Sequence, residues 1–168
     1  MNIVTLDFET YYSKDFSLRK LTTEEYIRDP RFQVIGVGLK VDDGITEWIA
    51  GDKVAERLKQ IHWGDCLLLC HNTMFDGAIL AWKYGVKPAG FLDTLSMARA
   101  VHGVDAGGSL AKLAIRYNIG EKGDEVVRAE GKRLEDFDPT DLKQYGEYCK
   151  NDVDLTYRLF NILSTDFP

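Results

Sequence analysis

The chain alternates between stretches whose apolar residues follow a strand-like pattern and stretches where they follow a helical one. Residues 2–9 are mostly β-branched and apolar, a composition typical of a strand. The pattern predicts further strands at 65–70 and 90–93, and a hairpin of 32–41 and 45–50 across the turn Asp42-Asp43-Gly44. Helices are expected at 22–28, 52–61, 73–84, 94–102, 109–118 and 140–163. The segment 119–138, rich in Gly and charge, is expected to be a mobile loop.

The order of these elements indicates the fold class. Three strands come first, and strands then alternate with helices. This order predicts an α/β fold with a mixed five-stranded sheet, three antiparallel strands followed by parallel ones, and helices on both faces. With 168 residues, the chain is expected to form one domain, 1–168, large enough to bury a core.

The first strand carries two carboxylates at its end. Side chains alternate between the faces of a strand, so Val4, Leu6 and Phe8 share one face, whereas Asp7 and Glu9 share the other. Two such charges repel by roughly 4 kcal/mol at 4 Å for an effective dielectric near 20. A divalent cation between them would offset that repulsion, and oxygen ligands suit Mg²⁺ or Mn²⁺. The alternative is that the strand simply ends in solvent at Asp7.

A second acidic residue follows the apolar run 66–70, which is typical of a buried strand. Asn72 is expected to cap the helix 73–84, and Asp76 then lies in the first turn of that helix. In one interpretation Asp76 belongs to an acidic site together with the first strand. In the other it only complements the helix dipole, worth ~0.3–1 kcal/mol.

The last predicted helix contains a third acidic position. Asp152 falls on or beside the apolar stripe of 140–163, where an uncompensated charge is unfavourable. Tyr148 precedes it by four residues and is therefore on the same face. Asp154 is two residues further on and points to the other side, so we expect it to be the solvated carboxylate.

Three motifs together resemble those of a known family, the DEDD 3′→5′ exonucleases of the ribonuclease H-like fold. They come in the same order and in the same context of strand end, strand-to-helix junction and late helix. The most similar group is the proofreading exonuclease domain of family A DNA polymerases, particularly the phage-type ones. A tyrosine four residues before the last aspartate, with Glu147 where the other branch has histidine, resembles the tyrosine branch. The motifs are Asp7-x-Glu9, Asn72-x-x-Phe75-Asp76 and Tyr148-x-x-x-Asp152.

The resemblance implies two divalent cations, Mg²⁺ or Mn²⁺, held by the acidic residues. Asp7, Glu9 and Asp152 would ligate the first ion. Asp7 would bridge to the second, supported by Asp76. Tyr148 would position the attacking water rather than act as a strong base, because the free pKa of tyrosine is near 10.

The resemblance also implies positions that contact the substrate. The family often carries an apolar wedge after the first motif, but Ser13 stands there, with the aromatic residues Tyr11, Tyr12 and Phe16 nearby. The expected substrate-binding residues are Thr10, Asn72, Phe75, Lys112 and Arg116. The charged residues Lys122, Arg128, Lys132 and Arg133 are candidates for phosphate contact or simply surface charges. His71 is expected to be structural.

Charge and motifs leave three functions open. The net charge of −6 counts against extensive duplex binding. The main hypothesis is a proofreading-type exonuclease that releases 5′-mononucleotides from single-stranded DNA 3′ ends, with a DNA polymerase domain or replication protein as partner. The first alternative is the same chemistry on RNA or short oligonucleotides by a stand-alone enzyme. The second is a catalytically inactive nucleic-acid-binding module.

The cysteines and apolar runs indicate a compartment. Cys66, Cys70 and Cys149 form no disulfide framework, which suits a reducing cytosol. We expect no secretory signal, because the N-terminus enters its first strand at once. No apolar run approaches the ~20 residues of a membrane span. A cytoplasmic protein of a bacterium or a phage-infected host is therefore expected.

Overall fold

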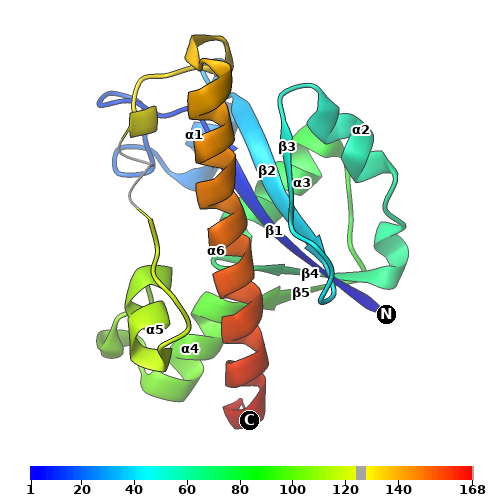
Figure 1. The fold of residues 1–168 in the computed structure, drawn as a ribbon, viewed down its shortest axis with the longest axis vertical. Helices are drawn as coiled ribbons and strands as arrows, with labels where there is room; N and C mark the ends of the chain where they lie inside the picture. The colour runs from blue at the N-terminus through cyan, green and yellow to red at the C-terminus, as the bar shows by residue number, and fades with distance from the viewer. Residues whose placement is uncertain (124–127, 168) are drawn as a thin grey trace.

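The computed structural model describes residues 1–123 and 128–167, and within them five strands form one mixed sheet (Figure 1). The strand order is β3-β2-β1-β4-β5. β1 pairs antiparallel with β2, and β2 with β3, whereas β1 pairs parallel with β4, and β4 with β5. The predicted sheet is therefore confirmed. The strands are β1 (Asn2–Thr10), β2 (Val34–Val41), β3 (Glu47–Ala50), β4 (Cys66–Cys70) and β5 (Gly90–Asp93).

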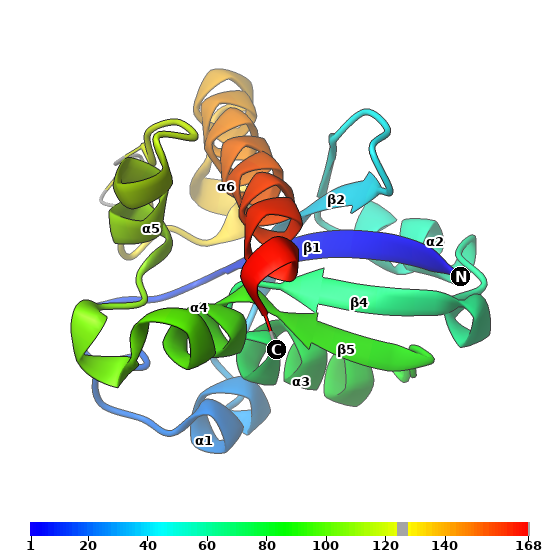
Figure 2. The same ribbon diagram turned by 90° about the horizontal axis from the view of Figure 1, so that it is seen from below.

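Helices cover both faces of this sheet, as predicted (Figures 1 and 2). Residues of α1, α2 and α3 pack in one core cluster with β1, and α4 and α5 pack against α6 in another. The predicted loop 119–138 contains a short 3₁₀ turn at Leu134–Asp136, while 124–127 lie outside the described residues. The helices are α1 (Thr23–Arg28), α2 (Lys53–Lys59), α3 (Thr73–Tyr84), α4 (Thr94–His102), α5 (Leu110–Tyr117) and α6 (Pro139–Asp166).

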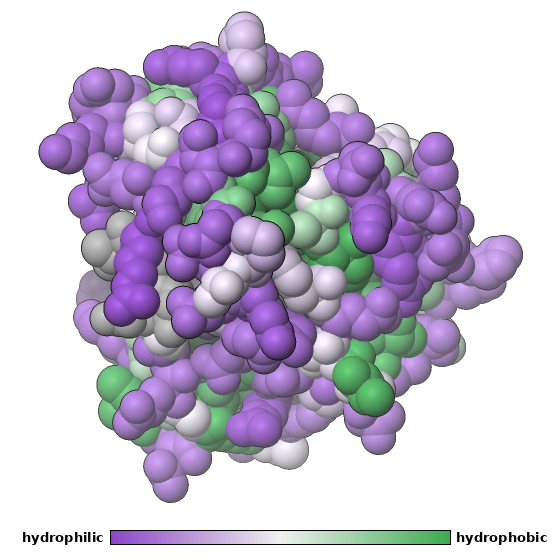
Figure 3. All heavy atoms as spheres, turned by 45° about the horizontal axis from the view of Figure 1, so that its top comes forward, coloured by the Kyte–Doolittle hydropathy of each residue, from purple (hydrophilic) through white to green (hydrophobic). Residues whose placement is uncertain are grey.

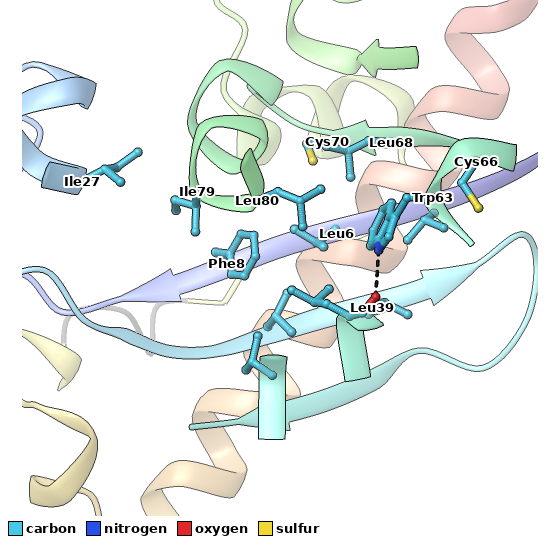
Figure 4. Close-up of a cluster of buried hydrophobic side chains, with 14 of the residues drawn as sticks. Leu6, Phe8, Ile27, Leu39, Trp63, Cys66, Leu68, Cys70, Ile79 and Leu80 are labelled. Atoms are coloured by element: carbon cyan, nitrogen blue, oxygen red, sulfur yellow. Dashed lines mark hydrogen bonds between the residues drawn. The ribbon is translucent and has the colours of Figure 1, made fainter. Parts of the chain in front are cut away.

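The main core lies on the face of β1 that the alternation predicts. Val4, Leu6 and Phe8 are all buried there, at most 4% exposed. Figure 4 shows Leu6 and Phe8 among side chains from α1, α3 and β4. Removing this apolar surface from water stabilises the fold by roughly 25 cal/mol per Å². The acidic residues Asp7 and Glu9 lie on the opposite face of β1.

The long helix α6 lies close against that acidic face. Asp138 caps it by accepting a 2.8 Å hydrogen bond from the Asp141 N–H, and Pro139 occupies the first turn. Gly38 of β2 allows the close approach, because a Cβ atom there would lie 2.9 Å from the sulfur of Cys149. The middle of α6 therefore contacts β1 and β2 directly.

One face of the molecule is largely polar. Hydrophilic side chains cover most of the face shown in Figure 3, and hydrophobic atoms show in smaller patches between them. Among the described residues, no helix has the length and apolar character to cross a bilayer.

Candidate active site

The end of β1 and the middle of α6 bring the first two carboxylates together. Glu9 is 7% exposed, and its Oε2 accepts a 2.6 Å hydrogen bond from the hydroxyl of Tyr145. The thiol of Cys149 lies 3.6 Å from Asp7 Oδ2. One ligand atom from each of Asp7, Glu9 and Cys149 falls within 4.8 Å of the others. The strand does not run out into solvent here, so that alternative is excluded.

The third carboxylate comes from the first turn of α3. Asp76 is 3% exposed, and its Oδ1 accepts a 2.9 Å hydrogen bond from the Phe8 N–H of β1. Burial raises the pKa of Asp76 well above its ordinary value, and the charge of Asp7 raises it further. A residue that served only the helix dipole would not lie beside another carboxylate. Asp76 therefore belongs to the acidic cluster.

The fourth carboxylate, Asp152, lies on the buried side of α6 and is 4% exposed. Its Oδ2 lies 2.8 Å from the Nζ of Lys122. Tyr148 is 6% exposed. Burial raises the pKa of the Tyr148 hydroxyl, and the Asp152 carboxylate raises it further by its charge and by a hydrogen bond. The helix spacing thus places this pair together as predicted.

These groups perturb one another strongly. Burial, and then the charge of Asp152, raises the pKa of Asp7 to about 7. Burial and the charge of Asp7 raise the pKa of Glu9 well above its ordinary value. Such a cluster is stable in its ionised form only with added positive charge. Its oxygen donors fit hard cations such as Mg²⁺ or Mn²⁺.

Asp154 differs from its predicted environment. It points away from Asp152, as the helix geometry predicts, and its side chain is 37% exposed, so it is partly solvated but also has partners. Its Oδ1 accepts a 2.5 Å hydrogen bond from the hydroxyl of Thr46 and lies 3.2 Å from the Nζ of Lys40. The pairing crosses more than 100 residues of sequence, so no local pattern could indicate it.

The substrate-binding candidates near β1 line one pocket beside the carboxylates. Thr10 and Phe75 both contribute to it, together with Glu9 and Tyr145. The Thr10 hydroxyl lies 2.8 Å from the hydroxyl of Tyr26, which fixes its orientation. The pocket next to Glu9 therefore has an aromatic and polar lining.

Asn72 is the N-cap residue of α3, as expected, but its side chain makes no capping hydrogen bond. Its backbone is left-handed, with φ of 78°, a conformation that asparagine tolerates better than most residues. The reason lies in tertiary structure, because the Asn72 N–H donates a 3.0 Å hydrogen bond to Oδ1 of Asp93. Its side chain is exposed.

The aromatic residues near the expected wedge position lie in different environments, one in the core and one in the pocket. Phe16 is 1% exposed and stacks on Tyr26 with ring centroids 4.6 Å apart, so its ring belongs to the core. Tyr12 lines the pocket, and so does Leu18, which is 47% exposed. Leu18 was missed because a lone leucine in an irregular segment gives no sequence signal.

The basic residues considered as phosphate or substrate contacts also differ in their surroundings. Lys112 and Arg116 are exposed on α5, and their contact with substrate stays a prediction. Lys132 lies 3.4 Å from Asp141, and Arg133 stacks over the ring of Tyr11 at 4.3 Å. Only Lys122, among the candidates whose contacts are described here, reaches the carboxylate cluster.

His71 is structural, as expected. Its Nε2 donates to the carbonyl of Gly108 at 2.7 Å, and its Nδ1 lies 2.8 Å from the hydroxyl of Thr94. Burial lowers the pKa of His71, which keeps the ring neutral. The ring thus joins the end of β4 to the segment before α5.

Sequence reasoning missed three contacts in the cluster, those of Tyr145, Cys149 and Lys122. Tyr145 and Cys149 lie on the same buried stripe of α6 as Tyr148 and Asp152. In the sequence these two positions look like ordinary core residues. Their spacing of three or four residues from the motif was the available signal. For Lys122 the sequence offers none.

Comparison with known proteins agrees with this geometry. A family described as 3′-5′ exonuclease matches residues 50–167, which include Asp76, Tyr148 and Asp152. A search of curated proteins finds no significant match.

Solved structures share the fold at low sequence identity. NrnC of Brucella melitensis has a TM-score of 0.70 at 18% identity, over 98% of this chain and 72% of that one. RNase D of Trypanosoma brucei has a TM-score of 0.71 at 18% identity, over 96% of this chain and 57% of that one. RNase D of Escherichia coli has a TM-score of 0.65 at 17% identity, over 98% of this chain and 39% of that one. The chain thus spans 57% of the length of the T. brucei RNase D and 39% of that of the E. coli RNase D.

The family match covers more than half of the chain, and the solved structures share its fold. The chain therefore belongs to the 3′-5′ exonuclease family, with the ribonuclease H-like fold of the DEDD enzymes.

Proposed function

We propose that this protein is a divalent-cation-dependent exonuclease that removes nucleotides from the 3′ ends of single-stranded RNA or short oligonucleotides and releases 5′-mononucleotides. The observation that carries the proposal is the convergence of four carboxylates and Tyr148 at the end of β1. Phosphodiester hydrolysis needs such a site, because charge develops on both the attacking and the leaving oxygen.

The carboxylates divide into two ligand sets. Asp7, Glu9 and Asp152 would hold one ion, and Asp7 would share a second with Asp76. The bond from the Phe8 N–H to Oδ1 holds the Asp76 carboxylate at the end of β1, beside Asp7. Two bound cations would supply an activated water and stabilisation of the leaving 3′ oxygen. In support, one NrnC structure is described with bound Mg²⁺.

Tyr148 would orient the attacking water. Its raised pKa keeps the hydroxyl protonated at neutral pH, so it acts as a hydrogen-bond partner and not as a base. Its ring is buried and stacks near Tyr145, with centroids 6.2 Å apart, which fixes the hydroxyl position. A rigid hydroxyl lowers the cost of aligning the water with the phosphorus.

The substrate end would enter the pocket beside Glu9. Phe75 and Tyr12 offer aromatic faces for the terminal base, and Leu18 offers an apolar one. Exposed Asn72 and the basic residues Lys112 and Arg116 would contact the strand further along. A net charge of −6 favours short contacts with a single strand over a broad duplex interface.

RNA is favoured as substrate by what the related structures contain. NrnC is described bound to pGG, and the T. brucei RNase D in complex with RNA U12. Single-stranded DNA, with a polymerase partner, is the second candidate, because the matched family is named for the exonuclease of DNA polymerase A. A reducing, cytoplasmic location is proposed from the three free cysteines among the described residues.

The test uses 5′-labelled RNA and DNA single strands of one sequence, with Mn²⁺ and with excess chelator. A ladder that shortens from the 3′ end, faster on RNA and abolished by chelator, is expected. Faster hydrolysis of DNA would favour the second candidate. Cleavage of a closed circle, or activity in chelator, would contradict the exonuclease proposal itself.

A further inference from the structure

The ammonium group of Lys122 lies at the solvent side of the carboxylate cluster. The Nζ of Lys122 is 2.8 Å from Oδ2 of Asp152 and 5.6 Å from the ring centroid of Tyr148. The Asp152 side chain is 5% exposed and that of Lys122 is 31% exposed. Lys122 thus contacts a nearly buried carboxylate from the solvent side.

The backbone just before Lys122 is tied to α6 by two residues, one before and one after Asp152. The Asn151 amide donates a 2.8 Å hydrogen bond to the carbonyl of Glu121. The Arg158 guanidinium donates a 3.0 Å hydrogen bond to the carbonyl of Ile119. These bonds hold the backbone before Lys122 against the helix, so the lysine is directed to Asp152 by the fold.

Lys122 contacts Oδ2 of Asp152, an oxygen that a cation held by this carboxylate would bind or lie close to. Mg²⁺ binds carboxylate oxygen at about 2.0–2.1 Å. An ion bound to Oδ2 of Asp152 would then lie within a few ångströms of the ammonium at its present position, and like charges at that separation repel strongly. The cation and the ammonium therefore cannot both occupy their best positions at Asp152.

We propose that Lys122 competes with the divalent cation for Asp152 and so sets the metal affinity of the site. This inference rests on the proposed function, which makes Asp152 a metal ligand. Lys122 supplies positive charge to the cluster when no cation is bound, and it withdraws from Oδ2 when one binds. The position makes Lys122 a residue that tunes cofactor binding, with no role in bond breaking.

The test measures Mn²⁺ binding by calorimetry and the melting temperature in chelator. Lys122→Met and Lys122→Gln remove the charge, so both should bind Mn²⁺ roughly tenfold more tightly than wild type, because a repulsive charge is gone. Both should melt at a lower temperature in chelator, because the buried Asp152 carboxylate loses its cationic partner. Lys122→Arg keeps the charge and should stay near wild type in both measurements.

Lys132→Met is the matched control. Lys132 also lies near one aspartate, at 3.4 Å from Asp141, and over one ring, at 5.5 Å from that of Phe137, but outside the cluster. It should leave Mn²⁺ affinity unchanged. Equal or weaker Mn²⁺ binding in both neutral Lys122 variants would overturn the competition.

Failure of the underlying site gives a different result. If wild type bound no Mn²⁺, or if Asp152→Asn bound it as tightly as wild type, the metal site at Asp152 would be wrong and the competition with it. If Asp152→Asn weakens binding while neutral Lys122 variants match wild type, only the role of Lys122 is overturned.

Discussion

The hydroxyl of Tyr145 on α6 donates a 2.6 Å hydrogen bond to Oε2 of Glu9 at the end of β1. Both groups are buried, with Tyr145 3% and Glu9 7% exposed. The bond fixes Oε2 of Glu9, and with it the orientation of the carboxylate beside Asp7. Tyr145 therefore orients a proposed metal ligand without being one itself.

Tyr145→Phe should weaken metal binding and activity by about 10–100-fold, the usual effect of losing a partner of a metal ligand. The ring is retained, so its stacking on Phe137, with centroids 5.5 Å apart, should preserve the fold. Metal titrations of activity and circular dichroism measure the two effects. Tyr157→Phe, elsewhere on α6, is the control and should behave as wild type. A Tyr145→Phe variant with full metal affinity would contradict this role.

Tyr148→Phe should keep the fold and the metal affinity and lose activity by roughly 10²-fold or less, because only the water-orienting hydroxyl is removed. Single-turnover rates at saturating Mn²⁺ measure the chemical step. Equal rates for Tyr148→Phe and wild type would exclude Tyr148 from the reaction, and a loss of metal binding would make it structural.

The raised pKa of Asp7 predicts how stability depends on pH in chelator. Its pKa is about 7 in the folded protein and ordinarily 3.8, so the folded state binds the extra proton between these values. Stability from this group is complete below pH about 4 and is lost as the pH rises through about 7. Glu9 and Asp76, whose pKa values are also raised, act in the same direction.

Wild type in chelator should therefore melt at a lower temperature at pH 8 than at pH 5, and Asp7→Asn should flatten this dependence. At pH 8 the variant should be the more stable protein and inactive, a stability–activity trade-off. Mn²⁺ should raise the melting temperature of wild type by mass action. Melting curves over this pH range decide, and a variant less stable than wild type at pH 8 would indicate a structural role for Asp7.

Local patterns predicted most of the fold, because sheet alternation and helix periodicity are local properties. The face shared by Val4, Leu6 and Phe8 is buried, and Asp7 and Glu9 lie on the opposite one, as the period of two requires. All five strands and six helices lie within a few residues of their predicted bounds.

Long-range contacts could not be predicted in the same way. Asn72 has the residue type of a cap, but Asp93 of the next strand holds its N–H in a left-handed turn. Asp154 has the spacing of a solvated residue, but Lys40 and Thr46 of the first hairpin lie against it. In both cases a tertiary partner overrides a local preference.

The two aspartates of α6 provide the sharpest test of the site. Asp152 is buried in the carboxylate cluster, whereas Asp154 pairs with Lys40 on the other side of the helix. Asp152→Ala should lose at least about 10²–10³-fold in rate, the scale of a positioned electrostatic group. Asp154→Ala should keep its rate within a few-fold but melt at a lower temperature, because Lys40, whose side chain is only 13% exposed, loses its carboxylate partner and keeps the Gly44 carbonyl. Rates at saturating Mn²⁺ and melting curves separate the two effects. An inactive Asp154→Ala beside an active Asp152→Ala would place the metal site on the opposite face of α6 and refute the assignment.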